Sequence, residues 1–546
     1  MPVDPIELQV LTGALRAACE EMGVVLIRSA HSSNIKERRD ASTALFDARG
    51  QMAMQAEHIP VHLGAMPAAV AAVLDERHEP GVSWILNDPF AGGTHLPDIT
   101  VVTPVFADAA GQRSGTAAAD TAAGTTARSR GGARARGPLI GFAASRAHHA
   151  DVGARVPGSM PADSRSLSEE GVVISPRPLD VSTPAGRRAL EELVARMRQP
   201  HERRADLRAQ LAANRVGAQR LAEIAARVGV ERLDAAVCAV LDYSERRTRA
   251  SLAALADGER RAQDVLEAPE GDLRLCLRAV VDGERLLLDF SGSAPQHGGN
   301  LNCPLAVTRS ACLFAVRVLT DPDIPPSAGA ERPIEVRAPR GSVLNATPGA
   351  AVAAGNVETS SRVADLVLAA FDRAQGQGTM NNLTLAAEAG AGASARAGFS
   401  YYETLGGGQG ACADADGPSG VHVAMSNTAN TPIEALEREF PLRVTEYALR
   451  RGSGGAGAHR GGDGVIRELQ ALADMTFSLI GERRRHAPRG ARGGGAGARG
   501  RDTLDGRELP AKTTGILRAG QRLRIETPGG GGFGPERPAK HEARSD

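Results

Sequence analysis

The sequence lacks several features that would place it in a familiar class of protein. Its six cysteines never approach a C-x-x-C spacing, which excludes a zinc ribbon and a dithiol redox centre, and 546 residues exceed the size of a small disulfide scaffold. Lysine and arginine together number 64, as do aspartate and glutamate, so no basic field is present to hold nucleic acid or an anionic membrane. We therefore expect a small molecule or another protein as partner.

Targeting and membrane signals are also missing. The N-terminal stretch "MPVDPIELQV" has neither the basic start nor the long apolar run of a signal peptide. No other run approaches the ~18 consecutive apolar residues that a membrane helix needs. The sequence thus predicts a soluble, cytoplasmic protein.

Motifs for nucleotide binding and for nucleophilic catalysis are absent as well. There is no G-x-x-x-x-G-K-[ST] phosphate loop, and "GGGQGA" does not open a helix inside a βαβ unit as a dinucleotide-binding turn would. A G-x-S-x-G nucleophile elbow is also lacking. Any chemistry that uses ATP must therefore take place outside this chain.

The length accommodates two to four domains, and the pattern of segments predicts an α+β fold, a multidomain mixed α/β chain. Helical periodicity from Leu190 to Val228 and from Glu231 to Ala256 predicts a helical hairpin, and dense glycine later in the chain is typical of tight turns in a β-rich part. We expect five parts: an N-terminal α+β part at 1–185, the helical hairpin at 186–262, an α+β middle part at 263–400, a glycine-rich and β-rich part at 401–536, and a disordered tail at 537–546.

Three local signals are specific. Asp4 followed by Pro5 predicts the start of a long amphipathic helix. Alternating residues on both sides of Asp282-Gly283 predict a β-hairpin. The stretches "RSACLFAVRVLT" and "SSRVADLVLAAFDRA" predict two further helices.

A small and polar segment at 109–137 has nothing to bury, and we interpret it as a disordered surface insertion. Without it, "THLPDITVVTPVF" and "GPLIGFAASRAHHAD" become consecutive strands that pair with each other. Each of these strands carries an H-x-x-D pair near one end, His95 with Asp98 and His148 with Asp151. Imidazole nitrogens and carboxylate oxygens converging from a rigid frame are typical ligands of a divalent metal, so the two pairs predict a metal site. The alternative is that the histidines cap a turn while the aspartates accept backbone N–H bonds.

Two further groups of polar residues stand near these strands. In "EHIPVHLGAM", Glu57 or His58 is a candidate general base around a proline-stiffened bend that also holds His62, although surface polar residues in a loop would give the same pattern. In "SNIKERRDAS", three basic side chains could bind an anion or simply form a solvated face; they are Lys36, Arg38 and Arg39.

Taken together, the motifs resemble the hydantoinase B/oxoprolinase family. The resemblance runs from about Ile6 to Gly534, and the matching stretches include "SNIKERRDASTALFDARGQMAMQAEHIPVHLGAM", "NDPFAGGTHLPDITVVTPVF", "AHHADVGARVPGSM", "YYETLGGGQGA" and "TPGGGGFG". The resemblance implies a division of labour in which a hydantoinase A-like, ATP-binding partner phosphorylates the substrate. The B-type chain then completes the reaction, within a hetero-oligomer.

Carried over from the family, the metal ligands are His95, Asp98, His148 and Asp151, and the metal is zinc or manganese. His149, Glu57 or His58 would move the proton during attack by water on the activated amide. The resemblance favours hydrolysis of a cyclic amide, a hydantoin or a lactam. The alternatives are a component of an ATP-dependent carboxylase of acetone or acetophenone, and a scaffold without catalytic function.

Overall fold

The computed structural model describes residues 4–57, 59–107, 137–376, 378, 380–388 and 398–536. His58, the tail at 537–546 and almost all of the expected insertion at 109–137 lie outside the described residues. Helices and several separate sheets make up the described part, which confirms the α+β class. None of its helices combines the length and the apolar character that crossing a membrane requires.

The N-terminal part is built on a six-stranded antiparallel sheet with the order β2-β1-β5-β4-β3-β6. Its strands are β1 (Ala41–Asp47), β2 (Met52–Glu57), β3 (Ser83–Leu86), β4 (Asp98–Phe106), β5 (Leu139–His148) and β6 (Arg177–Leu179). The helices around it are α1 (Pro5–Ser29), α2 (Ser33–Lys36), η1 (Pro60–His62), α3 (Ala65–Ala71), α4 (Pro184–Val194), α5 (Pro200–Val228) and α6 (Val230–Ala253), with a short turn η2 (Leu167–Glu169).

The two strands on either side of the expected insertion pair as the sequence predicted. β4 and β5 are antiparallel neighbours, and their register runs from Asp98 opposite His148 to Phe106 opposite Leu139. The pairing therefore begins at the residues that the sequence singled out for metal binding.

Both faces of this sheet are buried, and the alternation along β5 shows which core lies on each face. Ala143 and Ala147 belong to a core shared with α1, α5 and α6, whereas Phe142 and Ala144 belong to a core under α3. From Phe142 to His148, even-numbered residues of β5 therefore face α3, and odd-numbered residues face α1 and α5.

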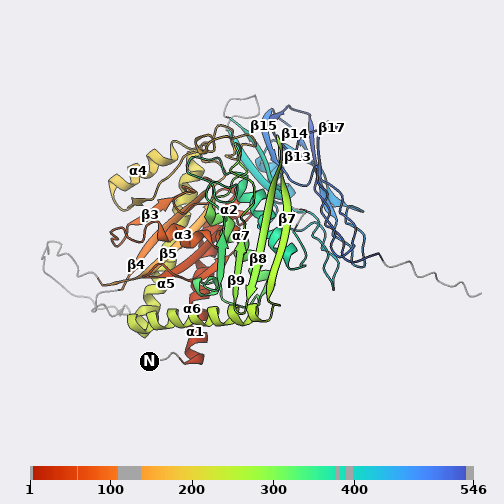
Figure 1. Cartoon of the computed structure of the whole chain (residues 1–546). Helices are drawn as coiled ribbons and strands as arrows, with labels where there is room; N and C mark the ends of the chain where they lie inside the picture. The colour runs from red at the N-terminus through yellow and green to blue at the C-terminus, as the bar shows by residue number, and fades with distance from the viewer. Residues whose placement is uncertain are drawn as a thin grey trace, which may run out of the picture.

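The helices α5 and α6 pack against the N-terminal sheet and share its core. At Gly229 the chain turns from α5 to α6, which runs across the bottom of the molecule in Figure 1, while α5 packs along α1 and the sheet. One core contains residues of both helices together with residues of α1, β1 and β5. The boundary expected between residues 185 and 186 consequently does not separate two cores, because α5 completes the core of the N-terminal sheet.

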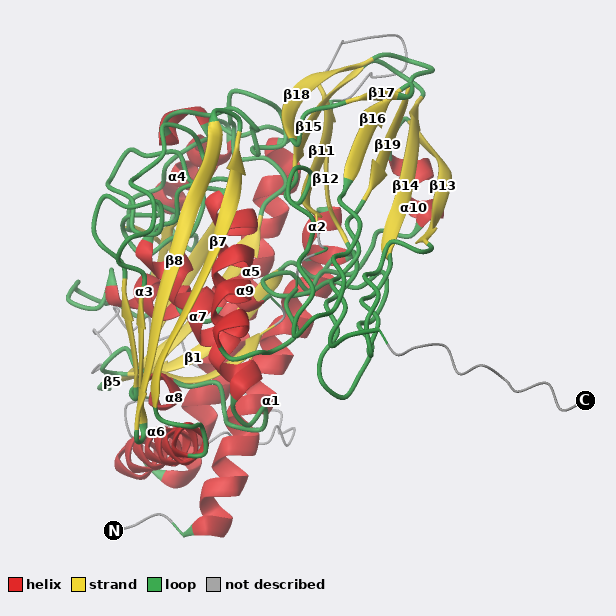
Figure 2. Cartoon of the chain, turned by 45° about the vertical axis from the view of Figure 1, so that its right-hand side comes forward, coloured by secondary structure: helices red, strands yellow, loops and turns green. Residues whose placement is uncertain are grey.

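The middle part contains a second sheet with the order β10-β9-β8-β7, in which only β10 and β9 are parallel. Its strands are β7 (Gly258–Ala268), β8 (Gly271–Asp282), β9 (Arg285–Asp289) and β10 (Ile334–Arg337), and the accompanying helices are α7 (Leu305–Leu319), α8 (Ala328–Glu331), η3 (Gly355–Thr359) and α9 (Ser360–Ala370). The predicted hairpin is present, with Asp282 opposite Arg285 and Gly283 at a φ of +54° in the turn. Figure 2 shows α7 and α9 behind β7 and β8, with which they share a core.

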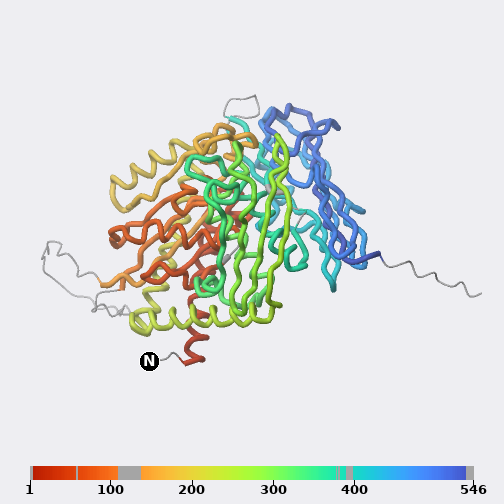
Figure 3. The backbone as a smooth tube through the Cα atoms, viewed as in Figure 1, coloured from red at the N-terminus to blue at the C-terminus, as the bar shows by residue number. Residues whose placement is uncertain are grey.

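The C-terminal part is β-rich, as predicted, and contains two sheets. One has the order β12-β11-β15-β18, and the other β13-β14-β19-β16-β17. The elements are β11 (Met380–Ala387), β12 (Phe399–Leu405), α10 (Ile433–Glu439), β13 (Leu442–Arg450), β14 (Gly464–Ala471), β15 (Met475–Ile480), β16 (Arg501–Leu504), β17 (Arg507–Glu508), β18 (Lys512–Leu517) and β19 (Arg522–Glu526). A single core draws residues from both sheets, and Figure 3 shows this third of the chain, in blue, at one side of the molecule beside β7 and β8.

Candidate metal centre

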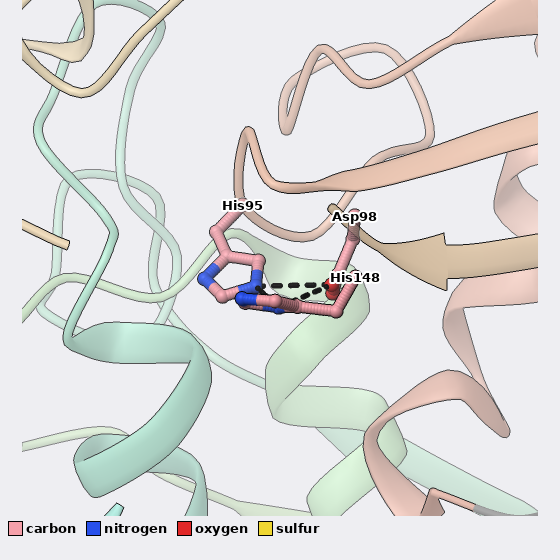
Figure 4. A group of neighbouring side chains, drawn as sticks. All are labelled: His95, Asp98 and His148. Carbon is pink, nitrogen blue, oxygen red and sulfur yellow. Dashed lines mark hydrogen bonds and ion pairs between the residues drawn. The ribbon is translucent and has the colours of Figure 1, made fainter. Parts of the chain in front are cut away.

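Three side chains with metal-binding atoms meet where β4 begins and β5 ends. His95 lies in the loop before β4, Asp98 is the first residue of β4, and His148 is the last residue of β5. The cross-strand register places Asp98 directly opposite His148, so the two side chains project from the same face of the sheet. Figure 4 shows the three side chains pointing toward one another, and all three are buried.

The three potential ligand atoms form a nearly equilateral triangle. Asp98 Oδ1 lies 3.1 Å from His95 Nε2 and 3.1 Å from His148 Nδ1, and the two ring nitrogens are themselves 3.1 Å apart. Ligands at ~2.1 Å from a shared ion stand about 3.0 Å apart in octahedral coordination and about 3.4 Å apart in tetrahedral coordination. The spacing of the side chains therefore fits a single divalent ion.

A fourth side chain, the imidazole of His62, approaches from the α3 side of the sheet. His62, at the end of η1, places Nε2 3.6 Å from Asp98 Oδ2, and its Nδ1 lies 2.9 Å from the hydroxyl of Ser42 in β1. His62 Nε2 and His148 Nε2 are buried and have no hydrogen-bond partner among the described residues. Buried polar atoms without partners are rare, and His62 Nε2, which faces Asp98, indicates that the cluster is built to meet another group.

Charge and burial act against each other in the cluster. Burial by itself would raise the pKa of Asp98, but the adjacent His95 and the contacts with His148 and His62 hold that pKa well below its ordinary value. Burial opposes protonation of His95, yet the Asp98 carboxylate outweighs it and raises the pKa of the imidazole. The carboxylate is therefore ionised at neutral pH, as a metal ligand must be.

Residues from distant parts of the chain cover the cluster. The ring of Tyr402, in β12, stacks on His148 with ring centroids 4.8 Å apart, and the guanidinium of Arg38 lies 4.7 Å from the Tyr402 centroid. Arg38 donates hydrogen bonds to the Tyr402 carbonyl at 2.5 Å and to the Thr428 hydroxyl at 2.9 Å. The cavity beside the cluster has a volume of about 30 Å³, which is room for little more than an ion or a water molecule.

The structure does not bring Asp151 into this group. Its carboxylate is buried beyond the end of β5 and accepts hydrogen bonds from two backbone N–H groups and two hydroxyls, those of Gly153, Gly158, Ser159 and Ser400. These are the backbone contacts that the alternative interpretation of the H-x-x-D pair expected. Asp151 therefore ties the turn after β5 to β12, and of the two pairs only His95 with Asp98 has both members in the cluster.

His149 points the other way from His148. Its Nε2 lies 3.0 Å from the Gln210 side chain of α5, on the opposite face of the sheet. Burial, reinforced by Arg203 and opposed by Asp206, lowers the pKa of His149 to about 4. The ring packs between β5 and α5, away from the cavity, so the structure gives it no contact through which to move a proton there.

The remaining sequence candidates divide into two sets. The backbone of Glu57 pairs with Ser42 at the end of β2, close to the strand that contacts His62, but its side chain and the whole of His58 lie outside the described part. Of the three basic residues considered for an anion, Lys36 and Arg39 are exposed, whereas Arg38 is fully buried. Arg38 is therefore neither a free anion donor nor part of a solvated face.

Sequence reasoning noted His62 without placing it at the metal and did not select Tyr402 or Asn356. Asn356, in the irregular helix η3, places Nδ2 3.5 Å from Asp98 Oδ2. The sequence signal for His62 is its place in "EHIPVHLGAM", two residues after a proline that fixes the bend. Tyr402 and Asn356 come from parts of the chain more than 250 residues away from Asp98, and no local pattern relates them to it.

Two relatives of known sequence match nearly all of this chain. It is 36% identical to 5-oxoprolinase 1 of Arabidopsis thaliana over 97% of its own length but only 42% of the relative's length. It is 30% identical to the B-type component of a putative D-/L-hydantoinase of a Pseudomonas species, with 97% of this chain and 90% of that protein covered. The chain thus spans about two fifths of the 5-oxoprolinase and most of the hydantoinase component.

Two solved structures share the fold. The ATP-dependent caprolactamase from Pseudomonas jessenii superimposes with a TM-score of 0.84 at 25% identity, covering 98% of this chain and 92% of that one. A nucleotide-free acetone carboxylase superimposes with a TM-score of 0.82 at 18% identity, over 97% of this chain and 76% of that one. The family model described as hydantoinase B/oxoprolinase matches residues 4–536. With nearly its whole length matched by that model, the chain belongs to the hydantoinase B/oxoprolinase family.

Proposed function

We propose that this chain is the B-type part of an ATP-dependent hydrolase of cyclic amides and that it works with a hydantoinase A-type polypeptide in a hetero-oligomer. The observation that carries the proposal is the buried cluster of His95, Asp98 and His148, with His62 beside it. Family membership supports hydrolysis of a carbon–nitrogen bond, and the activity for which the caprolactamase is named supports a cyclic amide as substrate.

Two observations support a partner. The sequence has no phosphate loop, and it matches only about two fifths of the length of 5-oxoprolinase 1. The hydantoinase relative is named as one component of an enzyme and is covered almost completely, which supports a second chain that supplies the rest. We assign ATP use and phosphorylation of the amide oxygen to that chain.

In this proposal the four side chains at β4, β5 and η1 hold a zinc or manganese ion. Such an ion lowers the pKa of a bound water and polarises a carbonyl or phosphoryl oxygen. The protein holds the ligands in place: Ser42 orients His62, Tyr402 stacks on His148, and Thr94 donates a hydrogen bond to Asp98 at 2.6 Å. The cavity of about 30 Å³ leaves little room for water beside the reacting atoms.

The residues proposed for proton transfer are not the four proposed to hold the metal. Glu57 and His58 stay candidates because the backbone of Glu57 pairs with Ser42, whose hydroxyl contacts His62. His149 contacts Gln210 on the other face, and Asp151 contacts backbone N–H groups, so our proposal gives neither of them a role at the metal.

A carboxylase is the second candidate function, and the fold shared with acetone carboxylase is the observation that favours it. In that case the substrate is a ketone and bicarbonate takes part. A third possibility, a scaffold that only holds the A-type partner, predicts that the histidine cluster is dispensable for turnover.

The test compares two adjacent histidines. The chain is purified with its A-type partner without added metal, and its metal content is measured by plasma mass spectrometry together with ATP-dependent opening of a lactam ring. We expect His148→Asn to lose most of the metal and to lower turnover by at least about 100-fold. His149→Asn, the matched control, is expected to retain the metal because its ring faces α5.

Other outcomes decide among the alternatives. ATP turnover that depends on bicarbonate and a ketone, with no opening of lactams or hydantoins, would replace the hydrolase by a carboxylase. Full activity of His148→Asn in an intact complex would leave only the scaffold. Equal metal loss in both variants would show that general misfolding, rather than ligand removal, explains the result.

A further inference from the structure

The cavity at the metal cluster is too small for the substrate that the proposed function requires. At about 30 Å³ it holds an ion or a water molecule, whereas ligand pockets commonly measure ~300–1,000 Å³. Only the reacting amide group of a substrate can therefore enter it. The ring of the substrate must lie in a neighbouring space.

A larger cleft stands directly beside this cavity. We call it the outer cleft; it has a volume of about 470 Å³, and its walls include Pro60, Leu63, Phe314, Val318, His422 and Ala424. Ser426 lines both spaces.

Two chain segments, 59–63 and 423–428, form the partition between the spaces. Within the first segment Ile59, Val61 and His62 face the metal cavity, while Pro60 and Leu63 face the outer cleft. In the second segment, Met425 faces the metal cavity and Ala424 faces the outer cleft. The partition is thus one layer of chain thick, and Met425 has a flexible side chain that can move aside.

The walls of the outer cleft suit a ring with few polar atoms. Seven of the twelve described lining residues are aliphatic or aromatic, the amides of Gln409 and Asn427 are among the polar ones, and no aspartate or glutamate is among them. The charged residue in the lining is Arg317, whose guanidinium donates hydrogen bonds to the carbonyls of Ile324 and Pro322. An anionic, phosphorylated intermediate therefore meets one positive charge and no negative charge in the walls.

His422 adds a polar group at a defined place in these walls. Both of its ring nitrogens are buried, and neither has a partner of good hydrogen-bond geometry among the described residues, although Asn430 lies nearby. Burial, together with the charge of Arg38, lowers the pKa of His422 to about 4. The neutral imidazole is therefore able to donate one hydrogen bond and to accept another at neutral pH.

We propose that the outer cleft is the substrate subsite and that it seats the methylene ring of a lactam, with the amide directed past Ser426 toward the metal cavity and His422 hydrogen-bonded to the ligand. This inference rests on the proposed function and makes it more specific. A lactam with an unsubstituted methylene ring fits these apolar walls better than a hydantoin, whose ring carries a second N–H and a second carbonyl.

The test fills the cleft without touching the metal cluster. Val318 lies on α7, is 48% exposed and lines the cleft, so Val318→Trp places a large ring in the cleft without disturbing a core. Val24→Trp is the matched control, because Val24 is 46% exposed on α1 and does not line the cleft. His422→Phe removes the imidazole nitrogens while retaining a ring.

Binding is measured on the full chain alone by saturation-transfer NMR with 2-piperidone, a six-membered lactam, and with hydantoin. We expect saturation of the methylene protons of 2-piperidone in the wild type and in Val24→Trp. The signal should be lost in Val318→Trp and weakened several-fold in His422→Phe. Hydantoin should give the weaker signal throughout.

This measurement needs neither metal, nor ATP, nor the partner, so it is independent of the proposed function. Saturation that Val318→Trp abolishes would support the subsite even if metal and turnover were absent. No saturation of 2-piperidone in the wild type, or equal saturation in Val318→Trp, would overturn the subsite even if the complex opened lactams. Stronger binding of hydantoin would overturn the preference for an apolar ring.

Discussion

His148 and His149 are neighbours in the chain but belong to different environments, because successive side chains of a strand point to opposite faces. His148 belongs to the candidate metal cluster on the α3 side of the sheet, and His149 contacts Gln210 of α5. Sequence spacing could identify the two histidines but could not say which of them shares a face with His95. That assignment depends on the pairing of Asp98 with His148, which only the register of β4 and β5 determines.

The same limit explains why one H-x-x-D pair has both members in the cluster and the other does not. Asp98 begins a strand, so its side chain is fixed by the sheet opposite His148. Asp151 follows the end of β5, where the chain turns and Gly153 has a φ of +83°. Outside a regular strand, a spacing of three residues does not determine where the second side chain points. The Asp151 carboxylate points toward backbone N–H groups instead of toward the cluster.

Burial of His149 predicts a loss of stability in mild acid. Its pKa is about 4 in the folded chain and about 6.5 in an unfolded one, so the unfolded state takes up the proton first as pH falls. Above pH 6.5 the ring is neutral in both states and the free energy of unfolding is unaffected. As the pH falls from about 6.5 to 4, the free energy of unfolding decreases by about 3 kcal/mol.

Urea unfolding at several pH values measures this contribution. Between pH 7 and pH 4 the wild type should lose about 3 kcal/mol more free energy of unfolding than His149→Gln, which has no proton to take up. His31→Gln, at an exposed position, serves as the control and should follow the wild type. Parallel curves for the wild type and His149→Gln would contradict the assignment.

At the scale of elements, the glycine-rich stretches of the C-terminal part pack backbone against backbone. The Gly455 N–H donates to the Gly530 carbonyl, and the Gly530 N–H donates to the Gly462 carbonyl, each at 2.8 Å. A Cβ atom on Gly530 would lie 1.9 Å from the Gln409 carbonyl oxygen. The glycine density predicted close backbone contacts correctly, but not which stretches meet, because glycine carries no side-chain pattern to specify a neighbour.

Gly530→Ala should therefore destabilise the C-terminal part. The added methyl group meets a backbone carbonyl that cannot rotate away, and we expect a loss of about 3 kcal/mol in the free energy of unfolding, the upper end of overpacking effects. Gly298→Ala is the control, because a Cβ atom at Gly298 has no heavy atom within 4 Å. Chemical denaturation compares the two variants, and equal midpoints would show that the glycine loops rearrange freely.

At the scale of the whole molecule, the candidate centre combines residues of the N-terminal part with residues of the C-terminal part. The N-terminal sheet supplies the ligands, and β12 and the segment around Thr428 supply the cover, with Arg38 bonded to both of the latter. Local signals predicted individual helices, the hairpin at Gly283 and the pairing of β4 with β5. They could not predict that α5 completes the N-terminal core or that Tyr402 stacks on His148, because those contacts depend on how distant elements pack.

Arg38→Lys tests the contact that Arg38 makes between the N-terminal and C-terminal parts. Lysine keeps the charge but cannot hold the Tyr402 carbonyl, the Thr428 hydroxyl and the face of the Tyr402 ring at once. We expect metal affinity to fall by about tenfold and the free energy of unfolding by about 2 kcal/mol, since Tyr402 no longer fixes His148.

Chelator titration and urea unfolding measure the two effects. Arg39→Lys, at the exposed neighbouring position, is the matched control and should change neither quantity. Unchanged metal affinity in Arg38→Lys, with lowered stability, would reduce Arg38 to a purely structural residue.

The register of β4 and β5 has a practical consequence. Asp98 and His148 stand at one end of the paired strands, and Phe106 and Leu139 stand at the other, a strand length of roughly 30 Å away. The connection between the two strands thus leaves from the end remote from the cluster. A fluorophore or an affinity tag attached at that end of the strands would start about a strand length from the candidate cluster, so it should leave His95, Asp98 and His148 undisturbed.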